Sequence, residues 1–301
     1  MENKRALLLF VDGFGLGKEE KWSYNPIETG NLPVLQNLLK NYGTMAVDAT
    51  LGVPGTPQSA SGQTTILTGV NAPKVIGKHL NGFPNGELRK IISKDNIFMK
   101  LQALGLKVTN ANAYNENFLS RLLRNPKATE EMSVSTVATL SAGLYLHTEE
   151  DLIKGTAVYQ DLTNRIMLEK TKAKVPIRTP GEAGELLGEI VKNHDFTFFE
   201  YFQTDLAGHQ KDFDRAYRVL EELDQFIGSL LESLCLENTL FVLVSDHGNI
   251  EDLSTSDHTM NKVPVIALGK DSINFRLNIN SIQDITPKIK DYFLRNDQTS
   301  E

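Results

Sequence analysis

Two adjacent side chains that can bind a metal follow an apolar run in the last third of the chain. Residues 239–244 are Thr-Leu-Phe-Val-Leu-Val, and Asp246 and His247 come just after them. His258 lies eleven residues beyond His247, across a polar spacer suited to a loop that folds back over a strand end. Functional groups collect at the carboxyl ends of strands in open parallel sheets. The pattern therefore predicts metal ligands at the end of a buried strand.

Two further acidic side chains follow apolar runs in the same way. Asp12 comes directly after the run 6–11 and precedes a glycine-rich segment. Asp205 and His209 follow the aromatic run 196–202 and are four residues apart. Such a pair converges on one cation when the segment forms a helical turn. Taken alone, Asp-Gly is more typical of an ordinary turn, and a lone histidine is more typical of a surface position.

A hydroxyl-rich loop supplies the candidate nucleophiles. Residues 52–62 are rich in Gly, Pro, Ser and Thr, and they lead into an expected helix over 63–67. A helix N-terminus attracts phosphate, and a serine there acts as a nucleophile when a metal stabilises its alkoxide. The alternative is a solvated loop whose hydroxyls cap the helix. The candidates are Ser59, Ser61, Thr64 and Thr65.

Together these carboxylates and imidazoles are enough for two divalent ions with a hydroxyl nucleophile between them. A site of this kind activates the nucleophile, polarises phosphoryl oxygens and stabilises the leaving oxygen. A competing pattern, a dinucleotide-binding G-x-G-x-x-G from Gly13, fails because Lys18 stands where the third glycine belongs.

The elements that must position these groups alternate along the chain. Helix-like segments separate the strand-like ones, which predicts a three-layer α/β/α sandwich with a mostly parallel sheet. Near-continuous apolar character places strands 6–11, 196–202 and 239–244 at its centre. The other predicted strands are 44–49, 107–112 and 263–268, and the predicted helices are 32–39, 63–67, 97–104, 149–169, 180–191 and 214–234.

No shift in composition divides the chain, so we expect one domain over 1–294 and a flexible tail over 295–301. Residues 74–97 form a long, loop-rich segment that we expect to act as a small lid. Within it, Lys74, Lys78 and His79 are candidate phosphate contacts, although solvated loop residues need no such role.

Composition excludes several classes of protein. The 301 residues are 40% hydrophobic and 23% charged, with a net charge of −7, so neither disorder nor a basic surface for duplex nucleic acid or membrane is indicated. Cys235 is the single cysteine, which suits a reducing cytoplasm, and we expect it to be a small core residue rather than a nucleophile. The apolar run 6–11 is too short for a signal peptide, and no segment is long enough to span a membrane.

In order along the chain, these motifs resemble the alkaline phosphatase superfamily, nearest its cofactor-independent phosphoglycerate mutase and phosphopentomutase branch. The resemblance covers residues 12–258 and includes Asp-x-x-x-His, Asp-His-Gly and a final Asp-His-Thr before Val-Pro-Val. It implies that one metal is bound by Asp205, His209 and His258. It implies that the other is bound by Asp12, Asp246, His247 and the nucleophile.

The resemblance also selects among the hydroxyls. Its spacing to the following Gly62-Gln63 and Thr68-Gly69 favours Ser59, with Ser61 second. The Cys-x-Pro-x-Arg signature of sulfatases is absent from this loop.

The mutases carry a large extra domain that is not evident between residues 70 and 204, which favours a phosphohydrolase. The expected substrate is a small phosphomonoester. A phosphodiesterase or nucleotide pyrophosphatase, a small phosphomutase and a metal-binding pseudoenzyme remain alternatives, although no expected group is missing. Mixed Asp and His ligands accept zinc, manganese or iron. Substrate identity and oligomeric state are left open.

Overall fold

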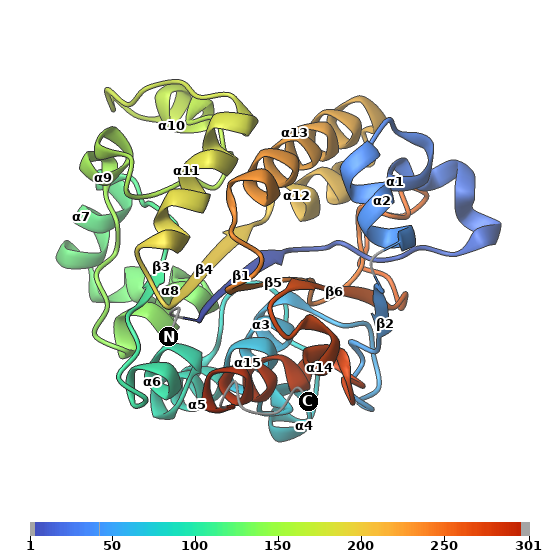
Figure 1. Cartoon of the computed structure of the whole chain (residues 1–301), viewed down its shortest axis with the longest axis horizontal. Coiled ribbons are helices and arrows are strands. Elements are labelled where there is room, and N and C mark those ends of the chain that lie inside the picture. The colour runs from blue at the N-terminus through green and yellow to red at the C-terminus, as the bar shows by residue number, and fades with distance from the viewer. Residues whose placement is uncertain (1–3, 42, 296–301) are drawn as a thin grey trace.

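One central sheet organises the computed structural model, which describes residues 4–41 and 43–295 (Figure 1). Within that part of the chain the strand order is β2-β6-β5-β1-β4-β3. The strands are β1 (Arg5–Val11), β2 (Met45–Val47), β3 (Val108–Asn110), β4 (Phe196–Tyr201), β5 (Thr239–Val244) and β6 (Val263–Gly269). β1 pairs in parallel with β4 and β5, and β4 pairs in parallel with β3. The prediction that β1, β4 and β5 lie centrally is therefore confirmed.

β6 is the exception, because it runs antiparallel to both β5 and β2. A parallel neighbour requires a long crossover connection, usually through a helix. Residues 245–262, which join β5 to β6, contain no helix and return directly beside β5. As a result, the segment that carries the candidate ligands stays at the carboxyl end of β5.

Two apolar cores lie on opposite faces of the sheet. On β1, Leu7 and Leu9 belong to one core, whereas Leu8 and Phe10 belong to the other. This double burial explains why the strand sequence is apolar throughout rather than alternating. The first face is covered by α1 (Pro26–Thr29), α2 (Pro33–Asn41), α11 (Pro180–Lys192), α12 (Gln203–Gln210) and α13 (Phe213–Ser233). The second is covered by α3 (Ser59–Thr68), α5 (Gly86–Lys94), α6 (Ile97–Gln102), α8 (Val134–Ser141), α14 (Ser272–Arg276), η3 (Ile282–Asp284) and α15 (Ile285–Leu294).

The remaining described helices lie outside these two layers. They are η1 (Glu19–Tyr24), α4 (Ala72–Ile76), α7 (Glu116–Arg124), η2 (Pro126–Glu131), α9 (Glu149–Lys154) and α10 (Arg165–Lys170). A third, small core formed by residues such as Leu152, Tyr159 and Met167 supports the region around α9 and α10.

The long helices follow their sequence signals closely. α13 begins after Asp212, whose carboxylate accepts the backbone N–H of Arg215 at 3.2 Å. α11 begins with a capping box between Thr179 and Glu182. These two helices pack against each other over the first face of the sheet.

Three predicted segments differ from the structure. The helix expected over 63–67 begins earlier, at Ser59, so the candidate nucleophile lies on the helix itself. The helix expected over 149–169 is split, because Gly155 adopts the left-handed conformation (φ 74°) and ends α9. The segment 74–97 is not mainly loop, because Asn85 caps α5 and Leu88 is buried.

One smaller prediction is wrong, and another is not tested by the structure. Cys235 is exposed and follows α13, so it is not a core residue. The flexible tail was expected over 295–301, and residues 296–301 of it lie outside the part of the chain that the structure describes.

Candidate metal centre

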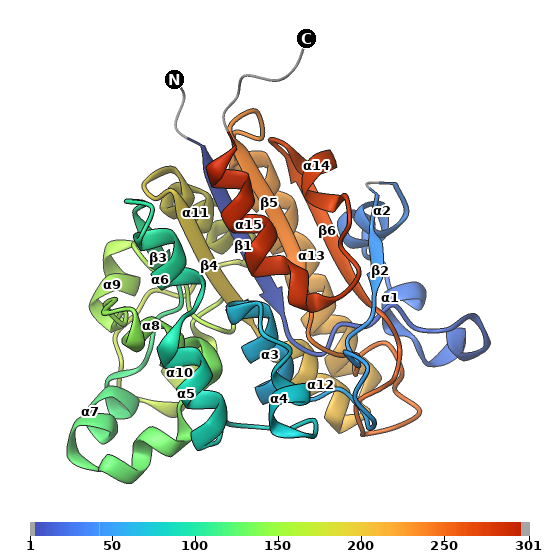
Figure 2. The same cartoon turned by 90° about the horizontal axis from the view of Figure 1, so that it is seen from below.

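The carboxyl ends of β1, β4 and β5 lie at one end of the sheet, near the start of α3 and near α12 (Figure 2), and the predicted site residues lie on these segments. Each lies at or just beyond the carboxyl end of a parallel strand, or on a segment that folds over that end. They are Asp12 after β1, Asp205 and His209 on α12 after β4, Asp246 and His247 after β5, His258 in the loop to β6, and Ser59 at the start of α3.

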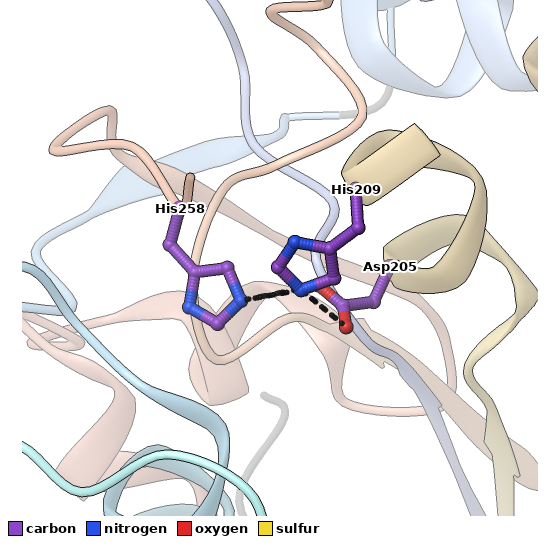
Figure 3. A group of neighbouring side chains, drawn as sticks. All are labelled: Asp205, His209 and His258. Atoms are coloured by element: carbon purple, nitrogen blue, oxygen red, sulfur yellow. Dashed lines mark hydrogen bonds and ion pairs between the residues drawn. The ribbon is translucent and has the colours of Figure 1, made fainter. Parts of the chain in front are cut away.

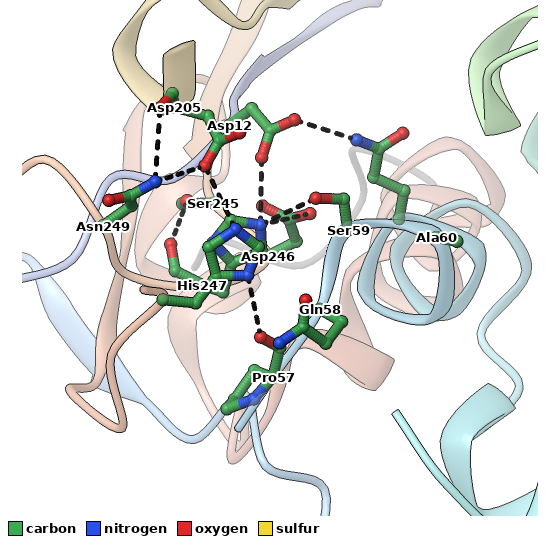
Figure 4. Close-up of polar contacts among 12 residues, drawn as sticks. Asp12, Pro57, Gln58, Ser59, Ala60, Asp205, Ser245, Asp246, His247 and Asn249 are labelled. Atoms are coloured by element: carbon green, nitrogen blue, oxygen red, sulfur yellow. Dashed lines mark hydrogen bonds and ion pairs between the residues drawn. The ribbon is translucent and has the colours of Figure 1, made fainter. Parts of the chain in front are cut away.

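Four of them form an inner group, defined here as Asp12, Ser59, Asp246 and His247 (Figure 4). The ring nitrogen Nε2 of His247 lies 2.9 Å from Ser59 Oγ, 3.2 Å from Asp12 Oδ1 and 3.6 Å from Asp246 Oδ2. His247 and Asp246 are fully buried, and Asp12 and Ser59 are nearly so. The centre therefore holds two carboxylates, an imidazole and a hydroxyl within reach of one another.

The other three form an outer group of Asp205, His209 and His258 (Figure 3). Asp205 lies 3.3 Å from His209 Nε2 and 3.4 Å from His258 Nε2, and the two Nε2 atoms are 3.1 Å apart. One ligand atom from each residue lies within 4.8 Å of the others, as binding to one cation requires. On the far side of each ring, Nδ1 faces a backbone carbonyl, of Ser256 for His209 and of Pro57 for His258. These contacts orient both rings with Nε2 toward the carboxylate.

The two groups are contiguous. The rings of His247 and His258 stack with centroids 3.7 Å apart. Ligand atoms of Asp205, Asp12 and His247 also lie within 4.8 Å of one another. Asp205, which the resemblance assigns to the outer metal, is therefore within reach of the inner group as well.

Buried carboxylate oxygens without hydrogen-bond partners distinguish the inner group. Both carboxylate oxygens of Asp246 and Oδ1 of Asp12 are buried without a hydrogen-bond partner. Burial and the negative charge of Asp12 raise the pKa of Asp246 well above its usual range. Burial opposes the charged form of His247, but Asp246 and Asp12 raise the pKa of its imidazole to about 10. A buried carboxylate of this kind needs a compensating cation, so the inner group fits a divalent metal.

In the outer group, the negative charge of Asp205 is compensated by side chains of the protein itself. Burial opposes ionisation of Asp205, but hydrogen bonds from His209 and His258 lower the pKa of its carboxyl. The hydrogen bond to Asp205 raises the pKa of His209. Mixed carboxylate and imidazole donors suit zinc, manganese or iron.

Close backbone contact around the inner group depends on glycine. A Cβ at Gly62 would lie 2.8 Å from Cβ of Asp246, so α3 approaches the ligand loop only without a side chain there. A Cβ at Gly208 would lie 2.5 Å from Oδ1 of Asn249, which fixes α12 against the same loop.

The structure separates the candidate hydroxyls. Ser61 Oγ donates to Gln58 O at 3.2 Å and accepts the N–H of Leu80, away from the metal groups. Thr64 and Thr65 donate to carbonyls of α3, at 2.6 and 2.8 Å. Among the hydroxyls proposed from the sequence, Ser59 is the one brought to the inner group.

Several supporting residues were not predicted from the sequence. Gln63 donates to Asp12 Oδ2 at 3.2 Å, and Asn249 donates to Asp205 Oδ1 at 2.7 Å. The fully buried Glu251 accepts the N–H of Asn249 and the hydroxyl of Thr259, at 2.7 and 2.5 Å. The only sequence signal for Asn249 and Glu251 was their position just after the Asp-His pair.

A cavity of about 450 Å³ opens beside the inner group. One wall of it holds Glu200 on β4, whose Oε2 accepts the hydroxyl of Ser135. Burial raises the pKa of Glu200 to about 7. The negative charge of Asp12 also raises this pKa, whereas the hydrogen bond from Ser135 lowers it. The cavity is lined by Asp12, Ser59, Gln63, Asn81, Gly82, Phe83, Asn112, Ala113, Tyr114, Asn115, Phe118, Glu131, Ser133, Thr136, Tyr159, Gln160, Glu200, Phe202, Asp205 and Leu206.

Lys74, Lys78 and His79, which were proposed from the sequence as phosphate contacts, are not part of this lining. Lys74 and Lys78 are exposed, and the His79 ring lies 3.2 Å from Val53 O. Residues 81–83 of the same segment do line the cavity.

The fold and these ligand groups define a metalloenzyme, and comparison with known families agrees. The chain belongs to the Metalloenzyme superfamily, whose family profile matches residues 4–296. Relatives include 2,3-bisphosphoglycerate-independent phosphoglycerate mutases from Desulforudis audaxviator (27% identical over 107 residues, 34% of this chain and 21% of that protein) and Mycoplasmopsis pulmonis (25% over 182 residues, 56% and 35%). The aligned part spans only a fifth to about a third of such relatives.

Solved structures share the fold over nearly the whole chain. The PH0037 protein from Pyrococcus horikoshii has a TM-score of 0.58 at 17% identity and full coverage of both chains. The alkaline phosphatase from the Antarctic bacterium TAB5 has a TM-score of 0.57 at 16% identity, covering 99% of this chain and all of that one. These matches confirm the predicted α/β fold and its alkaline phosphatase-like class. In the part of the chain that the structure describes, no helix is long and apolar enough to cross a membrane.

Proposed function

We propose that the protein is a two-metal phosphohydrolase that cleaves phosphomonoesters through a phosphoserine at Ser59. The observation that carries this proposal is the position of Ser59: its hydroxyl lies 2.9 Å from Nε2 of His247, in the group that holds the unpartnered oxygens of Asp246 and Oδ1 of Asp12, and Ser59 also lines the cavity. A phosphate at that position would contact the nucleophile, the metal groups and the first turn of α3 at once.

The inner and outer groups would hold two divalent cations, zinc or manganese before iron, which would activate the hydroxyl and neutralise phosphoryl charge. Ser59 Oγ forms the new bond to phosphorus, and the bond to the ester oxygen breaks, releasing the alcohol into the cavity. Water then cleaves the phosphoserine to give phosphate and restore the hydroxyl. Gln63 keeps Asp12 oriented, and Asn249 keeps Asp205 oriented.

The residues between the two halves of the site favour hydrolysis over a mutase reaction, because most of their secondary structure belongs to the sheet or its covering layers. Residues 70–204 supply β3, α5, α6, α8 and α11, which pack on the sheet. The parts of this stretch outside the two layers are short helices, so we expect them to exclude water poorly from a phosphoenzyme while its substrate reorients. A mutase is the second candidate, because curated relatives are phosphoglycerate mutases. The single cysteine favours action in the cytoplasm.

The test is a substrate panel with the metal-reconstituted protein: p-nitrophenyl phosphate, its diester, sugar phosphates and nucleotides. Release of phosphate from monoesters, with a mass-shifted peptide containing Ser59 after rapid quenching, is the expected result. Faster cleavage of the diester would indicate a phosphodiesterase, and interconversion of phosphoglycerates without phosphate release would indicate a mutase. No turnover of any ester at full metal occupancy would indicate a pseudoenzyme.

A further inference from the structure

The cavity beside Ser59 has an unusual charge pattern for a site that would receive phosphorylated acids. Beyond the metal groups, its charged lining residues are the two acids Glu200 and Glu131. Its described lining residues include no Lys, Arg or His. Above about pH 7, where Glu200 is ionised, a carboxylate or second phosphate on the substrate would meet like charge there, without a cation to bind it.

Arg121 is a cation on the neighbouring helix α7, but its guanidinium is already engaged. It pairs with Glu131 Oε2 at 2.8 Å and lies 6.0 Å from the ring centre of Phe118. This pair neutralises Glu131 and leaves Glu200 as the acid that characterises the cavity wall.

Aromatic rings form another part of the wall. Tyr114 and Phe118 stack with centroids 5.6 Å apart and planes 18° from parallel. Phe83, about half exposed, and the aromatic side chains of Tyr159 and Phe202 also line the cavity. Flat aromatic surfaces of this kind bind a planar ring.

Side-chain amides and Glu200 supply the polar contacts. Asn81, Asn115 and Gln160 line the cavity and offer both donors and acceptors. Glu200 is held in place through Ser135, and its backbone N–H donates to Asn112 Oδ1 at 2.8 Å. A carboxylate in this position accepts hydrogen bonds from hydroxyl or amino groups of a substrate.

We propose that this cavity selects phosphomonoesters of uncharged, ring-bearing, hydroxylated alcohols, of which nucleoside monophosphates are the representative class, and rejects phosphorylated carboxylic acids. This inference rests on the proposed phosphoryl transfer at Ser59 and concerns only the alcohol part of the substrate. Glu200 and the Tyr114–Phe118 stack are its specificity determinants.

Two matched substrate pairs test the proposal in the metal-loaded enzyme. Glycerol 3-phosphate and 3-phosphoglycerate have the same three-carbon skeleton, but only the second carries a carboxylate. Adenosine 5′-monophosphate and ribose 5-phosphate differ by the aromatic base. We expect kcat/KM to favour the first member of each pair by at least about tenfold. Equal or higher kcat/KM for 3-phosphoglycerate would overturn the rejection of acids, and equal values for the second pair would overturn the role of the rings.

Variants assign the selectivity to residues. Glu200→Gln keeps the shape of the side chain and its contact with Ser135 but removes the charge. It should therefore reduce the kcat/KM preference for glycerol 3-phosphate over 3-phosphoglycerate. The preference for adenosine 5′-monophosphate over ribose 5-phosphate should not change. Phe118→Leu should reduce only the kcat/KM preference for adenosine 5′-monophosphate over ribose 5-phosphate. Arg121→Gln is the matched control: loss of activity on 3-phosphoglycerate alone in this variant would show that Arg121 binds carboxylates, and would contradict the proposal.

The outcomes also separate this proposal from the one on which it rests. Absence of phosphate release from every ester, including p-nitrophenyl phosphate, rejects the phosphohydrolase itself. Release from p-nitrophenyl phosphate with the opposite preference in both pairs rejects only the substrate class.

Discussion

The inner and outer groups both combine Asp carboxylates with His imidazoles, but the buried charge is compensated differently in the two groups. In the outer group, Asp205 is surrounded by donors, and His209 is more than a third exposed on its side chain. In the inner group, Asp246 is fully buried and neither of its oxygens has a hydrogen-bond partner. The outer group is therefore largely satisfied by the chain alone, whereas the inner group depends on a cation.

This difference indicates that folding and metal binding are coupled mainly at the inner group. Without metal, the His247 imidazolium is the positive charge available to Asp246 and Asp12, which is why its pKa is raised to about 10. A metal ligand must lose that proton, so metal binding to the inner group should strengthen as pH rises. The following predictions test this division, from the largest expected effect to the smallest.

Ser59→Ala should lower turnover by at least about a thousandfold, because it removes the nucleophile next to the inner group. Fold and metal content should remain, since a single hydroxyl contributes little to stability. Ser61→Ala is the control, and its turnover should fall far less, because Ser61 bonds to Gln58 and Leu80 instead. The measurement is the steady-state rate of the two variants at equal metal occupancy. If Ser61→Ala is the inactive variant, the nucleophile is assigned to the wrong serine.

Asp246→Asn and His209→Ala should remove different metals. Wild-type protein should bind two ions per chain, and each variant should bind one, as measured by elemental analysis at saturating metal. Saturating metal at a thousand times Kd stabilises a folded protein by about 4 kcal/mol per site. We expect the larger loss of this stabilisation in Asp246→Asn, where a buried acid loses its metal. Equal losses in the two variants would contradict the distinction between the groups.

Glu200 tests the energetics of buried carboxylates away from the metals. Its pKa is raised from 4.5 to about 7, so it contributes stability below pH 4.5 that is lost as pH rises through 7. Glu200→Gln should therefore gain stability relative to wild type by up to about 3 kcal/mol between pH 4.5 and 8. Urea unfolding of metal-free proteins across this range measures the difference. A difference in unfolding free energy that does not change with pH would show that the pKa of Glu200 is not raised in the folded protein.

Asn249→Ala should have the smallest effect. It removes the amide that donates to Asp205, and loss of such an orienting contact lowers metal affinity about 10- to 100-fold. Competition with a chelator should show weaker binding of one ion and little change for the other. Weakening of both ions equally would indicate that Asp205 bridges the two groups.

The sequence by itself predicted the strands well, and it predicted which Asp and His side chains would gather at one end of the sheet. Fully buried strands need apolar side chains on both faces, so β1, β4 and β5 were evident as apolar runs, and β5 was predicted at its observed bounds. Asp12, Asp205 and Asp246 follow those strands directly, and parallel strands bring their carboxyl ends together. Local order along the chain was sufficient for these features.

Tertiary structure alone decided the rest. Whether Ser59 or Ser61 faces the ligands depends on the helical start of α3 and on its contact with Asp246 across Gly62. The cavity draws its wall from residues 81–83, 112–118, 131–136 and 159–160, which are separated in sequence and carry no shared pattern. The helix α5 was missed because its burial against α3 and α8, rather than the glycines and asparagines around it, determines its conformation. Contacts between distant segments set these features, and a linear pattern does not record them.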